Sequence, residues 1–154
     1  MAEILSDLDY LKMAVVNSRQ SMEDGNFPAG AILVKDGEIL ASEISSKYPG
    51  LLHADSKAVT HGFEKTGGLL EGATLYCSMQ SCLMCTSVAY WGGIRRIVYA
   101  VRKSEVDQNY YESPGDTAPL IASFNQKMEI VHMPQLEEET LGIVREWELT
   151  PPPG

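Results

Sequence analysis

The stretch ATLYCSMQSCLMCTSVAYWGG, residues 73–93, holds one strand, one helix and two closely spaced cysteines. Residues 73–79 are rich in amino acids that favour strands. A helix is expected from Cys82 to Trp91, and Gly92-Gly93 ends it. The stretch therefore predicts a strand that leads almost directly into a helix whose first turn contains both cysteines.

The segments around this stretch continue the alternation of strands and helices. Asp36-Gly37 is a strong tight-turn signal, so the two strands that flank it form a hairpin. Strands are expected at 27–34, 38–44, 73–79, 95–101 and 128–133, and helices from Ser6 to Gly25, from His53 to about Lys65, from Cys82 to Trp91, near 117–126 and from Leu136 to Trp147. This order predicts an α/β fold, a three-layer sandwich with a five-stranded mixed sheet and helices on both faces. Residues 1–150 are expected to form one domain, and 151–154 a loose proline-rich tail.

Composition narrows the class of ligand. The chain has 154 residues, a net charge of −9, and lysines and arginines that are mostly scattered singly. This charge pattern argues against nucleic acid as the main ligand, because its binding depends on clustered cations. A small, neutral or weakly charged ligand fits better. No apolar run is long enough for a membrane helix, and the acidic N-terminus lacks the pattern of a signal peptide, so a cytoplasmic protein is expected.

The two cysteines and an upstream histidine form a candidate metal site. Cys82 and Cys85 are three residues apart, which places both sulfurs on one side of a helix. The positive end of the helix favours the thiolate that a metal needs. His53 begins the preceding helix, and neighbouring strand-to-helix junctions meet at one edge of a sheet. Three protein ligands leave the fourth position of Zn²⁺ open, which is typical of a catalytic site.

Asp55, two residues after His53, is a candidate for proton transfer at this site. On a regular helix, residues two apart point about 200° away from each other. The two side chains can share a site only if His53 lies at the helix cap, before the regular helix begins.

Two other interpretations remain open at this point. Cys77 could join the other three residues in a closed structural Cys₃His site. Alternatively, Cys82 and Cys85 could form a thioredoxin-like redox pair, which leaves His53 and Asp55 unexplained. Cys77 lies in a β-rich run on the same face as Leu75, so it is expected to be a core residue.

Three segments together resemble the cytidine deaminase superfamily: FPAGAILV at 27–34, HAD at 53–55 and LYCSMQSCLMC at 75–85. The family signature is H-x-E followed by P-C-x-x-C. The resemblance covers about residues 8–101 and is closest to the branch that holds cytosine, guanine and tRNA adenosine deaminases. It implies a cytidine deaminase-like fold, usually dimeric, and zinc-dependent hydrolysis of the exocyclic amine of a nucleobase.

Carried over residue by residue, the resemblance assigns the parts of the site. The zinc ligands would be His53, Cys82 and Cys85, and the proton shuttle would be Asp55. The backbone N–H groups of Ala54 and Cys82 would face the substrate and the zinc-activated water.

Three positions depart from the family pattern. Asp55 replaces a glutamate, Ser81 replaces the proline before the first cysteine, and Ser45 stands where the family has an asparagine. The shorter carboxylate loses about one C–C bond of reach, and a displacement of about 1 Å can reduce a rate ~10²-fold. The departures indicate either a shifted substrate or a weakened catalyst.

The resulting hypothesis is a deaminase of a small free nucleobase, nucleoside or related amino-heterocycle of the cytosine or guanine type. Candidate substrate contacts are Phe27 and, as an aromatic lid, Trp147, with Tyr110, Tyr111 and Asp116 as further candidates. A homodimer is expected. The alternatives are a tRNA adenosine deaminase-like enzyme and a weakened or inactive zinc-binding homologue that acts as a partner subunit.

Overall fold

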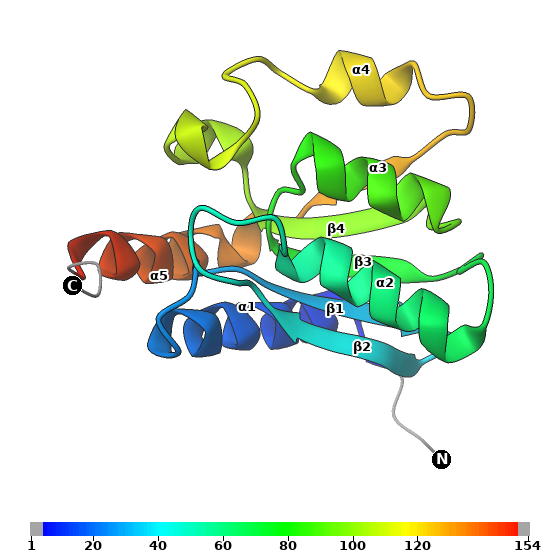
Figure 1. Ribbon diagram of the computed structural model, residues 1–154, viewed down its shortest axis with the longest axis horizontal. Helices are drawn as coiled ribbons and strands as arrows, with labels where there is room; N and C mark the ends of the chain where they lie inside the picture. The colour runs from blue at the N-terminus through cyan, green and yellow to red at the C-terminus, as the bar shows by residue number, and fades with distance from the viewer. Residues whose placement is uncertain (1–4, 151–154) are drawn as a thin grey trace.

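A five-stranded mixed sheet forms the middle layer of the molecule, with its strands in the order β2-β1-β3-β4-β5 (Figure 1). The computed structural model describes residues 5–150, so the predicted tail at 151–154 lies outside the described residues. β1 is antiparallel to β2 and β3, whereas β3, β4 and β5 are mutually parallel. The strands are β1 Gly30–Lys35, β2 Glu38–Ile44, β3 Thr74–Met79, β4 Arg96–Val101 and β5 Glu129–His132. The predicted five-stranded mixed sheet is confirmed.

Helices cover both faces of this sheet, as predicted. α1 and α5 lie on one face, and α2 and α3 lie on the other, with α4 beyond α3 (Figure 1). The helices are α1 Asp7–Glu23, α2 Ala54–Thr66, α3 Leu83–Trp91, α4 Ala118–Ala122 and α5 Glu137–Leu149. Short 3-10 helices occur at Lys103–Glu105, Gln108–Tyr110 and Pro134–Leu136. Among the described residues, no helix is both long and apolar enough to cross a membrane.

Side chains of the central strands alternate between two hydrophobic cores, one on each face of the sheet. This follows from the two-residue repeat of a strand. Leu33, Leu75, Cys77 and Ile97 pack in the core beneath α2 and α3, and Ile32, Tyr76, Val98 and Ala100 pack in the core beneath α1 and α5. Cys77 is 1% exposed. Its assignment as a core residue is therefore confirmed.

Local turn and cap chemistry sets the boundaries of the first elements. Asp36 and Gly37 both have positive φ, 51° and 76°, as a two-residue hairpin turn of the primed type requires. Ser6 caps α1 through a reciprocal pair of hydrogen bonds with Asp9. Gly67, at φ 74°, ends α2 in the left-handed conformation. Each boundary agrees with the prediction from the sequence.

A partly exposed ion pair joins the start of α1 to the sheet. Arg96, in β4, donates two hydrogen bonds to the Asp7 carboxylate, at 2.9 and 2.7 Å, and the Tyr76 hydroxyl donates a third at 2.6 Å. The hydrogen bonds from Arg96 lower the pKa of Asp7 from 3.8 to about 2, although partial burial opposes this. Asp7 also lies in the first turn of α1, where the helix dipole favours an anion.

Replacing Asp7 should therefore weaken the fold in a pH-dependent way. The folded-state pKa lies below the ordinary value, so the contribution is complete above about pH 4 and is lost as the pH falls toward 2. Because the pair is partly exposed, Asp7→Asn is expected to cost about 1 kcal/mol, or about 3 °C in Tm, at neutral pH. Thermal unfolding from pH 7 down to about pH 2 should show the Tm values of the two proteins converging below about pH 4. A constant difference across this range would contradict the assignment.

Candidate metal centre and active site

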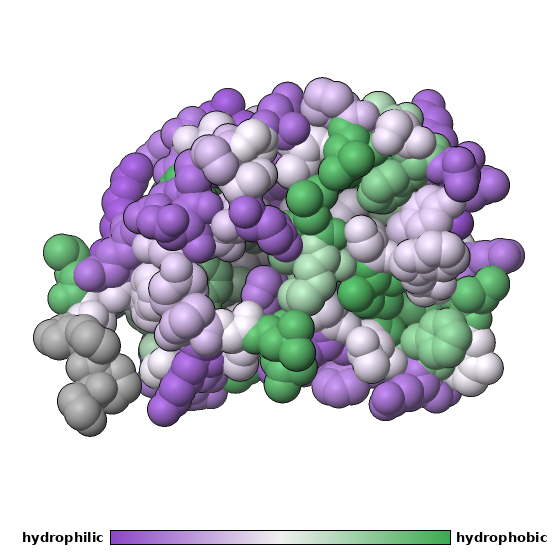
Figure 2. Space-filling view, turned by 45° about the horizontal axis from the view of Figure 1, so that its top comes forward, coloured by the Kyte–Doolittle hydropathy of each residue, from purple (hydrophilic) through white to green (hydrophobic). Residues whose placement is uncertain are grey.

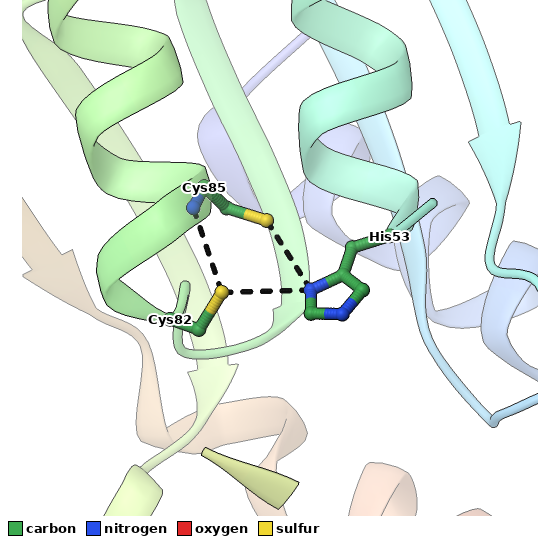
Figure 3. Close-up of side chains that lie close together, drawn as sticks. All are labelled: His53, Cys82 and Cys85. Carbon is green, nitrogen blue, oxygen red and sulfur yellow. Dashed lines mark hydrogen bonds between the residues drawn. The ribbon is translucent and has the colours of Figure 1, made fainter. Parts of the chain in front are cut away.

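Three potential metal ligands meet where α2 and α3 begin (Figure 3). His53 is the N-cap of α2, Cys82 is the N-cap of α3, and Cys85 lies in the first turn of α3. The His53 Nδ1 atom is 3.5 Å from the Cys82 sulfur and 3.4 Å from the Cys85 sulfur. All three ligand atoms lie within 4.8 Å of one another. The cap position of His53, on which a shared site with Asp55 depends, is confirmed.

This donor set fits a zinc ion. With Zn–N near 2.05 Å and Zn–S near 2.3 Å, a tetrahedral ion places its nitrogen and sulfur ligands about 3.6 Å apart. The observed separations of 3.5 and 3.4 Å are close to that value. One imidazole and two thiols are also the ligand types that zinc prefers, and three ligands leave one position open.

A backbone carbonyl orients the histidine ring. His53 Nε2 lies 2.8 Å from the Gly50 carbonyl oxygen. A carbonyl only accepts, so Nε2 must carry the hydrogen and donate it. In the neutral ring the lone pair is then on Nδ1, which faces the two sulfurs. Such a bond from the second ring nitrogen typically fixes the orientation and the tautomer of a metal-binding histidine.

The ligands also perturb one another electrostatically. Hydrogen bonding with Cys85, and next with His53, lowers the pKa of Cys82 to about 6 in spite of burial. The same interaction raises the pKa of Cys85, and the hydrogen bond with Cys82 raises the pKa of His53 to about 9. Cys82 thus favours the thiolate at neutral pH. A bound divalent cation would displace the protons that His53 and Cys85 retain.

Asp55 is placed beside this cluster without belonging to it. It lies in the first turn of α2, is only 8% exposed and lines a cavity next to His53 and Cys82. The Ser81 hydroxyl donates a hydrogen bond of 2.8 Å to Asp55 Oδ2. Burial raises the pKa of the Asp55 carboxyl, and this hydrogen bond opposes the shift. A carboxyl in such a setting can exchange protons with a bound molecule.

The cavity, about 190 Å³ in volume, opens at the edge of the sheet where β2, β3 and β4 end. Ligands bind at the carboxyl ends of strands in many open α/β sheets. Its lining comes from five places in the sequence: Phe27 and Ala29 before β1, Ser45 to Gly50 after β2, His53 and Asp55 at the start of α2, Met79, Gln80 and Cys82 at and after the end of β3, and Asn109 to Tyr111 after β4.

Some of the residues predicted to contact the substrate line the cavity, and others do not. Phe27 and Ser45 line it, whereas Ala54, Ser81 and Trp147 are not among its lining residues. Trp147 packs edge-on against Phe27, with ring centroids 5.3 Å apart. It therefore supports the aromatic wall from behind.

Of the other aromatic and acidic candidates, Tyr110 and Tyr111 line the cavity and Asp116 does not. The Tyr111 hydroxyl donates to the Gln80 carbonyl at 2.7 Å, and the Tyr110 hydroxyl donates to Glu148 at 2.5 Å. Burial raises the pKa of Tyr111 well above its ordinary value. Both hydroxyls thus have protein partners, and the rings are held as walls.

Several residues of the site were not singled out from the sequence. Tyr48 lines the cavity and contacts the rings of Phe27 and Tyr110, and Lys47 and Asn109 also line it. Lys47 and Tyr48 lie in a loop and Asn109 in a single 3-10 turn, and neither kind of segment has a periodic pattern that would mark them. One signal in the sequence could have indicated Tyr48 as a site residue: it is an aromatic residue directly before a proline, soon after a predicted strand.

A charged residue from the loop after β4 also reaches the start of α3. The Glu112 carboxylate accepts hydrogen bonds from the backbone N–H groups of Leu83 and Met84, both at 3.1 Å. Burial raises the pKa of Glu112, but backbone hydrogen bonds outweigh this and lower it. The buried Lys103 donates from Nζ to Gln108, Ser113 and Gly115, which holds the same loop in shape.

Comparison with known proteins agrees with this geometry. Residues 5–101 match the cytidine and deoxycytidylate deaminase zinc-binding region. The chain belongs to this family. It is accordingly a zinc-dependent deaminase, a hydrolytic enzyme, with His53, Cys82 and Cys85 as the cluster able to bind the metal.

Individual relatives differ in the substrate that their names state. The deaminase is 29% identical over 145 residues to a probable cytosine deaminase of Schizosaccharomyces pombe, which covers 88% of each chain. It is 30% identical over 96 residues to a tRNA-specific adenosine deaminase of Aquifex aeolicus, covering 59% of this chain and 63% of that one. The structure of a guanine deaminase from Nitrosomonas europaea superposes with a TM-score of 0.81 at 16% identity, over 97% of this chain and 88% of that one. That likeness shows the shared fold.

The metal assignment predicts different results for two buried cysteines. Cys85→Ser should lose zinc, because it removes a thiolate ligand, and should unfold at a lower temperature. Cys77→Ala should keep about one zinc per chain, because Cys77 lies in the core outside the ligand cluster. Zinc content after dialysis against a mild chelator measures both. Loss of zinc from both variants would instead indicate a closed site with four protein ligands.

Proposed function

We propose that the enzyme deaminates a small free nucleobase, a nucleoside or a related amino-heterocycle of the cytosine or guanine type. The observation that carries this proposal is the cavity in which Asp55, the metal cluster and an aromatic wall meet. Flat heteroaromatic rings are suited to a slot lined by Phe27, Tyr48, Tyr110 and Tyr111.

The size and charge of the cavity favour a small substrate over RNA. Its volume of about 190 Å³ is below the roughly 300–1,000 Å³ typical of pockets for drug-sized ligands. Lys47 is the one lysine among its described lining residues, and arginine is absent from them. The net charge of −9 also opposes a polyanion. A tRNA substrate remains the second candidate, because relatives include tRNA-specific adenosine deaminases.

The reaction replaces the ring amine by oxygen and releases ammonia, with one water consumed. Zn²⁺ held by His53, Cys82 and Cys85 would supply Lewis-acid activation of that water at neutral pH. Asp55 takes a proton from the attacking water and delivers it to the ring nitrogen. It then takes the second proton from the new hydroxyl group on the ring carbon and delivers it to the amine, so that the C–N bond breaks, the C=O bond forms and ammonia leaves. The aromatic wall orients the ring, and burial of the site limits access of bulk water. The thiolate ligands suit the reducing cytoplasm, where we expect the enzyme to act.

Removing the carboxylate should stop turnover without removing the metal. Asp55→Ala is expected to reduce kcat by roughly 10²–10⁴-fold, the usual contribution of general acid–base catalysis. Its zinc content should stay unchanged, because Asp55 is not one of the clustered ligands. Ammonia release is measured from a panel of free bases, nucleosides, amino-heterocycles and an anticodon stem-loop RNA.

The panel also decides between the candidate functions. Turnover of the RNA alone would replace the small-molecule assignment with a tRNA-editing one. If zinc-loaded protein releases no ammonia from any compound of the panel, the result would favour an inactive homologue that serves as a partner subunit. Full activity of Asp55→Ala would contradict the proposed role of this residue.

We also propose that the enzyme is a homodimer that uses the face formed by α2, α3 and α4. Apolar side chains gather on this face in Figure 2. The exposed large apolar residues of these helices are Phe63 in α2, Trp91 in α3 and Leu120 in α4, and Trp91 is 78% exposed. Exposed apolar groupings of this kind commonly mark protein interfaces, and closed two-fold dimers are the commonest assembly.

An acidic residue in this face should separate the subunits. Trp91→Glu is expected to shift the mass measured by light scattering from about two chains to one, because it introduces a charge into an apolar contact. Leu149→Glu is the matched control, since Leu149 is 86% exposed but lies at the end of α5, on the opposite side of the sheet. Equal masses for both variants would refute this interface.

A further inference from the structure

We propose that Ser81 is a positioning residue that holds the short carboxylate of Asp55 in its working orientation, an inference that rests on the proposed function. The Ser81 hydroxyl lies 2.8 Å from Asp55 Oδ2, and both side chains are buried. Ser81 directly precedes the N-cap of α3, and Asp55 lies in the first turn of α2. The hydrogen bond therefore joins the two segments that carry the metal ligands.

The direction of this hydrogen bond follows from its chemistry. An ionised carboxylate only accepts, so Ser81 must give its single hydroxyl hydrogen to Asp55. The buried Cys77 thiol lies 3.5 Å from Ser81 Oγ and is free to donate to that oxygen in turn. Burial raises the pKa of Cys77 well above its ordinary value, so the thiol keeps its hydrogen. The thiol also hydrogen-bonds with Asp55 itself, so Cys77 and Ser81 together surround the carboxylate, and the hydroxyl of Ser81 makes the 2.8 Å contact with it.

A short carboxylate needs such a partner more than a long one. A buried charged group without hydrogen bonds is strongly disfavoured, so Asp55 would otherwise turn toward any donor or take up a proton. The bond from Ser81 engages Oδ2 and so sets the direction in which the carboxylate faces. Displacements of about 1 Å at a reacting group can cost ~10²-fold in rate, so this orientation matters.

The two residues also depart together from the deaminase signature, which has glutamate and proline at these positions. Proline has no hydroxyl and could not make this bond. Serine therefore supplies a donor at the same site where the carboxylate has become shorter.

The test is a double-mutant cycle of kcat. Ser81→Ala should lower kcat about 10- to 100-fold with KM and zinc content unchanged, and Ser81→Thr, which keeps the hydroxyl, should restore most of the loss. In an Asp55→Glu background the same Ser81→Ala change should cost less than about 3-fold, because the longer side chain does not depend on Ser81. Equal losses in both backgrounds would mean that Ser81 only shapes the entry to α3, and would overturn the proposal.

Ser78→Ala is the matched control for this cycle. Ser78 is also buried, near the end of β3, but its hydroxyl accepts from the Gly30 backbone N–H and is not in contact with Asp55. Its replacement should change kcat equally in the Asp55 and Asp55→Glu backgrounds. Coupling as large as that of Ser81 would show that the cycle reports general disturbance of β3, which would overturn the proposal.

Thermal unfolding of the zinc-loaded proteins gives a readout that is independent of activity. Ser81→Ala should lower Tm in the wild-type background and lower it less in an Asp55→Ala background, where the acceptor is already missing. Equal shifts would overturn the proposed hydrogen bond. A coupled unfolding cycle in a protein that deaminates nothing would instead overturn the proposed function and leave the hydrogen bond standing, so the two failures are distinguishable.

Discussion

The site depends on the convergence of two helix N-termini at one edge of the sheet. His53 and Cys82 are the N-caps of α2 and α3, and Cys85 follows one turn later. Capping residues have extended backbone and point away from the helix axis, so they can face a neighbouring element. The positive helix ends also stabilise thiolates and the nearby carboxylate. Both the metal cluster and the position of Asp55 follow from this one arrangement.

Burial gives the remaining parts of the site their chemistry. The core beneath α2 and α3 includes Cys77 and encloses one side of the site. Desolvation raises the pKa of Asp55, Cys77 and Tyr111, which favours their protonated forms. Hydrogen bonds act in the opposite sense at Asp55. Burial and the Ser81 hydrogen bond therefore act against each other on the pKa of Asp55, the residue for which we propose proton transfer.

The wall opposite the metal is built from loops that other charged groups hold in place. Lys103 fixes the loop after β4 through three hydrogen bonds, and Glu112 from that loop binds the start of α3. The pairing of Tyr110 with Glu148 links this loop to α5. Elements that are far apart in the sequence thus share one wall, and its shape depends on all of them.

The sequence by itself determined the order of the elements, the presence of helices on both faces of the sheet and the residues of the metal cluster. These features depend on short-range signals: the Asp36-Gly37 turn, the Ser6 cap and the three-residue spacing of Cys82 and Cys85. Periodicity and local chemistry are enough for the turn, the cap and the cysteine pair, because their partners lie within a few residues. His53, 29 residues before Cys82, joined the predicted cluster because it also begins a helix.

Only the tertiary structure decided which side chains reach the cavity. It placed Ser81 behind Asp55 and Trp147 behind Phe27, and it brought Tyr48 and Asn109 into the wall. Those positions result from packing between distant loops, where conformation depends on contacts across the fold and leaves no periodic trace in the sequence.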